Sequence, residues 1–435
     1  MKHPLGELFT TIPFRKYEQV IPYQAPKTGP KPWFDLQGAI GLMVLKSYYG
    51  CSDKKLIDQL NHNKMMQFFC GINLKAGQQI IDDDVVSRWR KRTGEHLKSI
   101  EVVIGLQLSN ALHWKPQMNQ TKTNLSDATC YESYVRYPTD VKLLWESIEY
   151  LYGQMKTICK YISIAMPRSK YKEQKSKYLS YQKSRKKTHK QTRRTIKRLL
   201  YLLNKYLELL PGLIGEMKRQ ECERLVLCSM KANFFSRIST IKKVYQQQQF
   251  HFDHPKSKVK DRIVSLAKPY LRPIVRGKEI KRVEFGMKVH EMQIDGINFI
   301  EHWDFNAFHE GVRMKKTLWK HQYLFRQKVK LFGGDQLYAN NANRRYCSEQ
   351  NIQTCFVPKG KPNKDKTIKK QKQQLRQLIG KERATRLEGS FGNKKNHYLL
   401  GKIKARLLET ELAWIFFGNL TANAVAMAKR RKPPP

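Results

Sequence analysis

The sequence predicts an α/β protein in which an all-α module precedes a mixed core and a long helical insertion interrupts that core. Three observations support this prediction. Apolar residues follow a helical spacing from Phe34 to about residue 115. A basic stretch with a helical apolar stripe occupies residues 166–250. From Asp261 the pattern changes to the alternation that is typical of strands.

The N-terminal part divides into an arm and a helical module. Residues 1–33 are rich in proline and turn formers, so we expect an extended arm. Residues 34–115 form the helical module, in which Ser52 or Asp53 is placed to cap the second helix. We expect the third helix over residues 83–112.

The expected third helix carries a cluster of basic residues. The cluster consists of Arg88, Arg90, Lys91 and Arg92. It is either a solvated helix face or a surface that contacts DNA. We treat residues 34–115 as a DNA-binding domain.

The mixed core is expected over residues 116–428. It begins with a short strand, Lys122 to Thr129, and Asp127 lies at the end of that strand. A helix follows Pro138, and Thr139 or Asp140 is its expected cap.

The insertion, at about residues 150–255, is strongly basic. Between Arg168 and Arg198 there are 14 basic residues and one acidic residue. An apolar stripe from Ile196 to Leu210 predicts a helix that Pro211 breaks. A run of charge is often only a solvated helix face, but charges of one sign repel one another, which favours a surface that follows DNA.

The second half of the core is expected to alternate strands and helices. Asp295-Gly296 lies between two apolar alternations, which is a strong β-hairpin signal. A helix at about Leu318–Gln327 precedes a strand, and Asp335 comes directly after that strand. The chain closes on the helices 375–400 and 403–428 and a basic tail, 429–435.

The charge balance points to a nucleic-acid partner. The chain has 83 Lys and Arg against 36 Asp and Glu, a formal net charge of +47. Such a surface attracts polyanions. An RNA-binding protein of the ribosomal type, or a generally basic surface, is the alternative.

The cysteines and the apolar stretches indicate an intracellular protein. The eight cysteines form no CxxC pair and have no histidines at zinc-ligand spacing, so they are interpreted as reduced core residues. The longest apolar stretch, Leu412–Ala428, is interrupted by Asn419, Thr421 and Asn423. We expect a cytoplasmic, nucleoid-associated protein without a membrane span.

The order of elements suggests a metal-dependent site. Acidic residues that follow parallel strands meet at one edge of a sheet, and this order of strands and helices matches an RNase H-like core. Two Mg²⁺ (or Mn²⁺) ions held by Asp and Glu oxygens can activate a nucleophile and stabilise a leaving oxygen in phosphodiester chemistry. A single Asp after a strand is more often a turn former or a helix cap.

Three segments in order resemble the insertion-sequence DDE transposases of bacteria. They are DATCYESYVRYPTD, GGDQLYANNANRRYCSEQNI, and LEGSFGNKKNHYLLGKIKARLLETELAWIFFGNLTANAV. The resemblance implies that Asp127, Asp335 and Glu388 are the catalytic, metal-binding acids. It extends over about residues 30–430 and includes the N-terminal helical domain.

The third segment departs from the family pattern. Relatives often carry Tyr and Arg at fixed spacing before the Glu, and here those positions hold Lys381 and Ala384. Lys395 stands where the family has a Lys that binds phosphate, although it can also be a plain surface lysine. Arg383 and Arg386 are nearby.

The implied function is DNA transposition, in which the enzyme cleaves the ends of an insertion sequence and transfers the strands to target DNA without a covalent protein–DNA intermediate. Its partners are the double-stranded transposon ends and target DNA, bound by a homodimer. The residues expected to contact DNA are Arg88, Arg90, Lys91, Arg92, Arg136, Lys186, Lys187, Arg193, Arg194, Arg383, Arg386 and Lys395. The alternatives are a metal-dependent RNase H-like nuclease and a non-catalytic basic DNA-binding protein.

Overall fold

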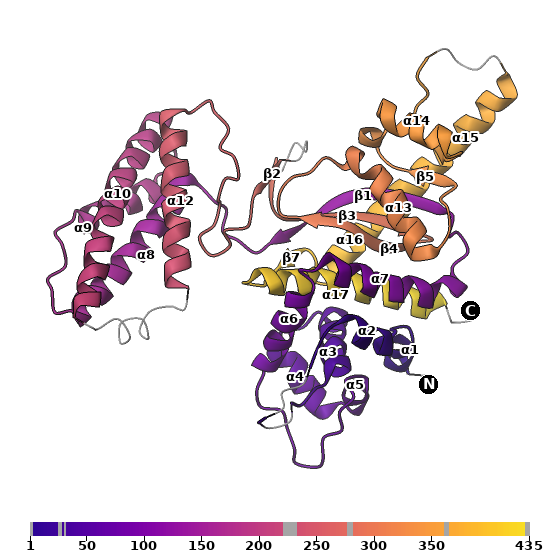
Figure 1. Cartoon of the computed structure of the whole chain (residues 1–435), viewed down its shortest axis with the longest axis horizontal. Coiled ribbons are helices and arrows are strands. Elements are labelled where there is room, and N and C mark those ends of the chain that lie inside the picture. Colours follow the sequence, from indigo (N-terminus) through magenta and orange to yellow (C-terminus); the bar gives the residue numbers. More distant parts are fainter. Residues whose placement is uncertain are drawn as a thin grey trace. The chain divides into compact units, whose positions relative to one another are not determined.

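Two units make up the chain in the computed structural model. One comprises Met1–Tyr134 and Ile274–Pro435, and the other is Val135–Pro273. The structure describes residues 3–24, 28–29, 32–220, 233–275, 282–360 and 365–430. The elements are drawn in Figure 1, where colour follows the sequence.

The N-terminal segment is helical rather than an extended arm. It forms α1 (Pro4–Thr10) and α2 (Phe14–Val20). Leu8 and Tyr17 are buried, and Tyr17 donates a hydrogen bond to Asn110. The expectation for residues 1–33 is therefore wrong over these two helices, because their apolar residues find partners in the helical module and their burial stabilises short helices that local propensity alone would not.

The helical module follows the predicted start and stop signals. Its helices are α3 (Leu36–Tyr49), α4 (Asp53–His62), α5 (Lys64–Phe69), α6 (Asp84–His96) and α7 (Ile100–Trp114). Ser52 caps α4 through the amide of Lys55 at 3.2 Å. The expected third helix is two helices, because Ser99 starts a new one by accepting a hydrogen bond from the amide of Val102 at 3.3 Å.

A curled mixed sheet forms the centre of the first unit, which comprises Met1–Tyr134 and Ile274–Pro435. Its strands are β1 (Thr123–Ser133), β2 (Pro273–Val275), β3 (Val283–Ile294), β4 (Ile297–Asp304), β5 (Leu331–Gly333), β6 (Gln353–Thr354) and β7 (Lys402–Ile403). Strand β1 pairs antiparallel with β3 and parallel with β5 and β7. Strand β3 also pairs with β2 and β4, and β6 follows β5.

The predicted hairpin is confirmed. Asp295 and Gly296 join β3 to β4, and both have positive φ angles, 48° and 79°. Two positive φ angles are what a tight hairpin turn of this kind requires. Asp295 is held further by Arg430, whose Nη1 lies 2.7 Å from its carboxylate.

Helices cover both faces of the sheet. They are α13 (Met314–Phe325), α14 (Asn341–Glu349), α15 (Lys366–Glu382), α16 (Glu388–His397) and α17 (Leu408–Arg430). Asn124 lies 3.2 Å from His321 of α13, whereas the next residue, Leu125, packs against Ile379 and Leu387. Because neighbouring residues of a strand point to opposite faces, α13 and the α15–α16 region lie on opposite sides of β1.

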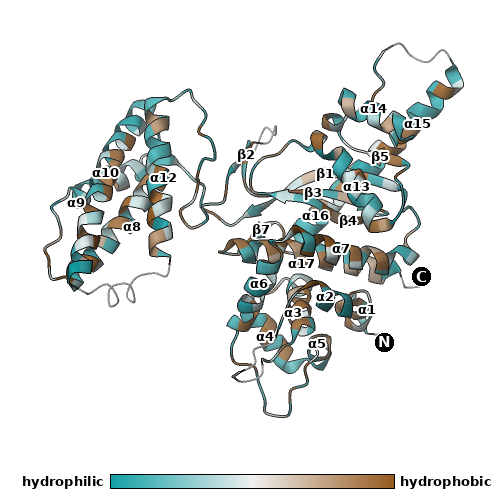
Figure 2. Cartoon of the chain, viewed as in Figure 1, coloured by the Kyte–Doolittle hydropathy of each residue, from teal (hydrophilic) through white to brown (hydrophobic). Residues whose placement is uncertain are grey.

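The second unit is helical. Its helices are α8 (Asp140–Tyr161), α9 (Tyr171–Lys183), α10 (His189–Arg219) and α12 (Phe234–Asp253). Figure 2 shows apolar and polar residues on each of them. The predicted break at Pro211 is wrong, because α10 continues through it. Leu213 and Met217 are buried beyond the proline, so packing offsets the lost hydrogen bond.

Across the residues that the structure describes, no helix combines the length and the apolar character that crossing a membrane requires.

Candidate active site

Asp127 lies in the middle of β1, not at its end. The strand continues to Ser133 because β3 pairs with it along most of its length, with Asp127 opposite Glu291. The parallel pairing with β5 ends earlier, at Leu125 and Gly333. Asp127 therefore lies just beyond the last parallel pair of β1 and β5. A site at the carboxyl edge of the sheet was predicted to need an acid at this position.

Asp335 follows β5 as predicted. Its carboxylate Oδ1 accepts a hydrogen bond from the amide of Leu337 at 2.8 Å and so caps the short helix η3 (Gln336–Tyr338). A Cβ on Gly333, the last residue of β5, would lie 2.6 Å from side-chain atoms of Leu125 and Ile379, so a glycine lets these side chains pack against the end of the strand.

Glu310 is an acid that the sequence reasoning missed. It begins the short helix η2 (Glu310–Arg313). A Cβ on Gly311 would lie 2.1 Å from the carbonyl oxygen of Leu337, so only glycine allows η2 to approach η3 this closely. Asn343 fastens the contact, because its amide donates to the carbonyl of Gly311 at 2.7 Å. A Glu-Gly pair shortly before a helix was the only signal in the sequence that could have indicated Glu310 as a site residue.

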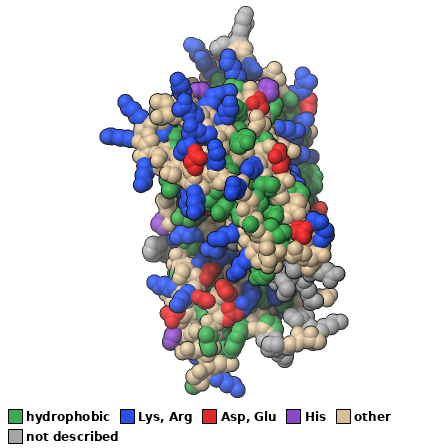
Figure 3. Space-filling view, turned by 90° about the vertical axis from the view of Figure 1, so that its left-hand side faces the viewer, with side chains coloured by type: hydrophobic (Ala, Val, Ile, Leu, Met, Phe, Trp, Pro, Cys, Tyr) green, Lys and Arg blue, Asp and Glu red, His purple; other side chains and the backbone are tan. Residues whose placement is uncertain are grey.

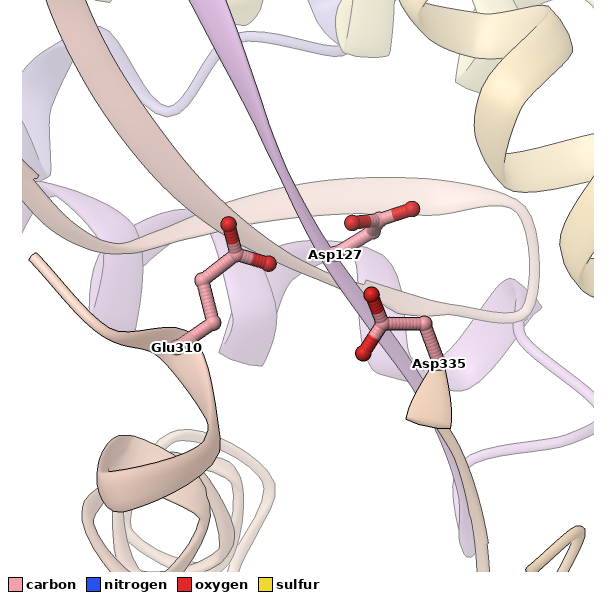
Figure 4. Close-up of side chains that lie close together, drawn as sticks. All are labelled: Asp127, Glu310 and Asp335. Carbon is pink, nitrogen blue, oxygen red and sulfur yellow. The ribbon is translucent and has the colours of Figure 1, made fainter. Parts of the chain in front are cut away.

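Asp127, Glu310 and Asp335 form one acidic cluster. Each offers a carboxylate oxygen, and these oxygens lie within 4.8 Å of one another. Figure 4 shows the three side chains converging from β1, from η2 and from the end of β5. Hard divalent cations prefer oxygen ligands in this arrangement.

The cluster perturbs its own ionisation. Burial, and next the negative charge of Glu310, raise the pKa of Asp127 to about 6. Burial is also the main cause of the raised pKa of Asp335. These carboxylates therefore resist ionisation, and a bound divalent cation would relieve that cost, so the residues present fit a metal ion.

Two cations lie beside the cluster. Lys288 Nζ is 2.7 Å from Glu310 Oε1. Arg383 Nη1 is 3.0 Å from Asp127 Oδ2, and its Nη2 is 3.3 Å from Glu388 Oε1. Glu388, with half of its side chain exposed, thus reaches the site through Arg383 and is not one of the three clustered acids.

A π-helical turn explains how Arg383 reaches Glu388. The segment η4 (Arg383–Leu387) lies between α15 and α16 and has one extra residue in its turn. Arg383, five residues before Glu388, therefore lies on the same side of the helix as the acid. Ala384, at the position where relatives carry Arg, is exposed, as is Lys381.

Behind the site, a buried ion pair ties α16 to the sheet. Lys394 is fully buried against Glu291, the residue opposite Asp127, and also donates to Asn419 at 2.7 Å. Tyr131 donates a hydrogen bond to Glu291 at 2.6 Å. Burial lowers the pKa of Lys394. The neighbouring Lys395, the predicted phosphate contact, is half-buried.

The other predicted DNA contacts differ in exposure. In α6, Arg88 is exposed and pairs with Asp82, and Lys91 and Arg92 are exposed. Arg90 is buried, 2.7 Å from Asp53, so it supports the fold and is not part of an exposed basic face.

The basic residues predicted in the second unit lie on its surface. Those exposed are Arg136, Lys186, Lys187, Arg193 and Arg194. Figure 3 shows many Lys and Arg side chains on the face in view. Arg386, in η4, is also exposed and lies 3.1 Å from Glu382.

Two family models match separate parts of the chain. Residues 1–92 match the family model "Transposase domain (DUF772)", and residues 333–424, which include Asp335 and Glu388, match "Transposase DDE domain". Searches of curated proteins and of solved structures gave no match. These two transposase models, one towards each end of the given sequence, support an insertion-sequence DDE transposase.

Proposed function

We propose that this transposase cleaves and joins DNA at a site built on Asp127 and Asp335, with Glu388 as the third catalytic acid. The observation that carries the proposal is that carboxylate oxygens of Asp127, Asp335 and Glu310 converge within 4.8 Å of one another. The chain that holds them also matches a DDE domain. Glu310 contributes a further oxygen at the same place. Two Mg²⁺ or Mn²⁺ ions are the expected cofactors.

The strand order supports an RNase H-like core. Strands β4, β3 and β1 are antiparallel neighbours, and β1, β5 and β6 are parallel neighbours. The two acids of the proposed site lie on β1 and directly after β5, where the parallel pairing ends. Ligand sites in α/β sheets occur at such carboxyl ends.

The residues of the proposed site have different roles in the reaction. A bound divalent cation supplies Lewis-acid polarisation of the phosphate and lowers the pKa of the attacking water or 3′-hydroxyl. Asp127, Asp335 and Glu310 provide oxygen ligands. Arg383 holds Glu388 beside Asp127 and presents a guanidinium to a phosphate oxygen. Hydrolysis frees a 3′-hydroxyl at the transposon end. This hydroxyl then attacks a phosphodiester of the target, forms a new P–O bond and displaces the target strand's 3′-oxygen, which leaves as a hydroxyl.

DNA binding is assigned to the exposed basic surfaces of both units. The helical module contributes Arg88, Lys91 and Arg92, and the second unit contributes its exposed Lys and Arg residues. Contacts of this kind bind the phosphate backbone and place the DNA without reading its sequence. Because two ends must be paired, we propose a homodimer on DNA, in the cytoplasm at the nucleoid.

The test uses the variants Asp127→Asn, Asp335→Asn and Glu388→Gln with a labelled transposon end. Each variant should lose Mg²⁺-dependent cleavage and the joining of pre-cut ends, while end binding stays close to wild type. Glu349→Gln, an exposed acid at the end of α14, is the matched control. Near-wild-type cleavage by any of the three would remove that residue from the site. Cleavage without joining by the wild-type chain would indicate a nuclease instead.

A further inference from the structure

An aromatic and cationic surface lies on α13, outside the acidic cluster. Trp319 is 60% exposed, which is unusual for so large an apolar side chain. Its ring stacks on Tyr323, with centroids 5.4 Å apart and an interplanar angle of 18°. Arg326 lies 4.8 Å from the centre of the Tyr323 ring. The three side chains therefore form a ladder along one side of the helix.

The ladder borders a shallow recess of about 420 Å³. The residues that line it are Trp319, Gln322, Tyr323, Arg326, Gln327 and Lys328. Gln327 is held in place because its side-chain carbonyl accepts a hydrogen bond from Thr121 at 2.6 Å. The recess thus combines a flat aromatic wall with amides that can bond to polar ring edges.

The surroundings of the recess are positively charged. Lys315, Lys316, Arg326 and Lys328 are exposed, and the sequence contains no Asp or Glu between Glu310 and Asp335. A protein surface or a lipid headgroup would not need flat aromatic stacking together with a purely cationic rim. A nucleotide offers both a planar base and a negative phosphate.

The helix also leads away from the proposed catalytic site. Glu310 lies in η2, and α13 begins directly after η2 at Met314. With a rise of about 1.5 Å per residue, Trp319 lies about 8 Å and Arg326, further along the recess, about 18 Å along the axis from Met314. That span corresponds to a few nucleotides of one strand, at about 3.4 Å each.

We infer that Trp319 and Tyr323 form a stacking site for an unpaired nucleotide of the DNA strand that approaches the acidic cluster. The aromatic ring of Trp319 stacks on the base, Gln322 contacts its edge, and Arg326 and Lys328 contact the adjacent phosphates. The inference rests on the proposed function only in taking DNA as the ligand.

The experiment measures binding without catalysis. Wild type and the variants Trp319→Ala, Trp319→Leu and Trp319→Phe are titrated, in EDTA, against a labelled duplex that ends in three unpaired nucleotides and against the fully paired duplex. Loss of one base stack should weaken binding of the unpaired substrate about 5- to 100-fold in the Ala and Leu variants. The Phe variant should stay within about threefold of wild type, because it keeps an aromatic face.

The leucine variant separates stacking from simple apolar contact, since it retains bulk but has no ring. Equal binding of the unpaired substrate by Trp319→Leu and wild type would overturn the inference. An equal loss of binding for both substrates would also overturn it. A change in the oligomeric state of the variants in ultracentrifugation would overturn it too, because it would indicate that this surface contacts a second copy of the chain. Because no cleavage is scored, failure here leaves the catalytic assignment untouched, and loss of cleavage in Asp127→Asn leaves the stacking site untouched.

Discussion

The guanidinium of Arg383 lies 3.0 Å from the carboxylate of Asp127, although 256 positions separate the two residues. The same guanidinium reaches Glu388 at 3.3 Å. One arginine therefore joins an acid of the central strand to an acid of the last third of the chain. It does so only because a π-helical turn shifts it by one residue relative to the usual helical spacing.

We predict that Arg383→Ala lowers the rate of end cleavage by about 10- to 100-fold, which corresponds to the roughly 1.5–3 kcal/mol of a hydrogen bond to a charged group. Moving the arginine by one residue, in Arg383→Ala/Ala384→Arg, should not restore the rate, because position 384 is exposed. Arg345→Ala, at an exposed arginine of α14, is the matched control. Single-turnover cleavage measures all three, and recovery in the double variant would argue against the π turn.

A second prediction concerns stability and pH. The pKa of Asp127 is raised to about 6 in the folded protein from an ordinary value of 3.8. The folded state therefore binds more protons than the unfolded state between these values, and Asp127 destabilises the metal-free protein increasingly as the pH rises through 6. Asp127→Asn should stabilise the protein at pH 7 in EDTA by up to about 3 kcal/mol, and the difference should shrink towards pH 4.

Urea unfolding at pH 7 and at pH 5, with and without Mg²⁺, checks this second prediction. Mg²⁺ should stabilise wild type, because a cation relieves the charge of the cluster, and should stabilise Asp127→Asn less. An asparagine variant that is less stable than wild type at pH 7 in EDTA would contradict the raised pKa.

Local signals in the sequence were sufficient for much of the fold. The hairpin turn at Asp295-Gly296 was predicted because two residues with positive φ define it without help from distant contacts. Asp335 was placed correctly because its strand and turn are adjacent in sequence. The helices at residues 4–20 were missed, since only burial against the helical module stabilises such short segments.

The remainder of the site depends on contacts that no local pattern encodes. Glu310 joins the acids because Gly311 touches the backbone of Leu337, a contact across 26 positions. Arg383 reaches Glu388 because of a π turn, whereas an ordinary helical spacing would not bring residues five positions apart to the same side. Arg90 was predicted to contact DNA, but its partner Asp53 lies in another helix and holds it in the interior.

The contact at Gly311 yields a third prediction. Gly311→Ala places a Cβ 2.1 Å from the carbonyl oxygen of Leu337, so η2 must move away from η3 and take Glu310 from Asp335. We expect a loss of stability of about 1–3 kcal/mol and a higher Mg²⁺ concentration for half-maximal cleavage. Gly153→Ala, in α8 with no atom within 4 Å, should instead be neutral or stabilise by about 0.5–1 kcal/mol. Equal behaviour of the two variants would contradict the close approach.

The buried pair of Lys394 and Glu291 gives the last prediction. Lys394→Met leaves Glu291 charged and without its main partner in the interior, so we expect a loss of about 3–5 kcal/mol in the free energy of unfolding. Adding Glu291→Gln removes the unpaired buried charge and should recover a large part of that loss, because Tyr131 and Asn298 keep a hydrogen-bonding partner at position 291. A double-mutant cycle in urea measures the coupling. Additive losses would mean that the pair does not interact, and that α16 is held on the sheet by its apolar contacts alone.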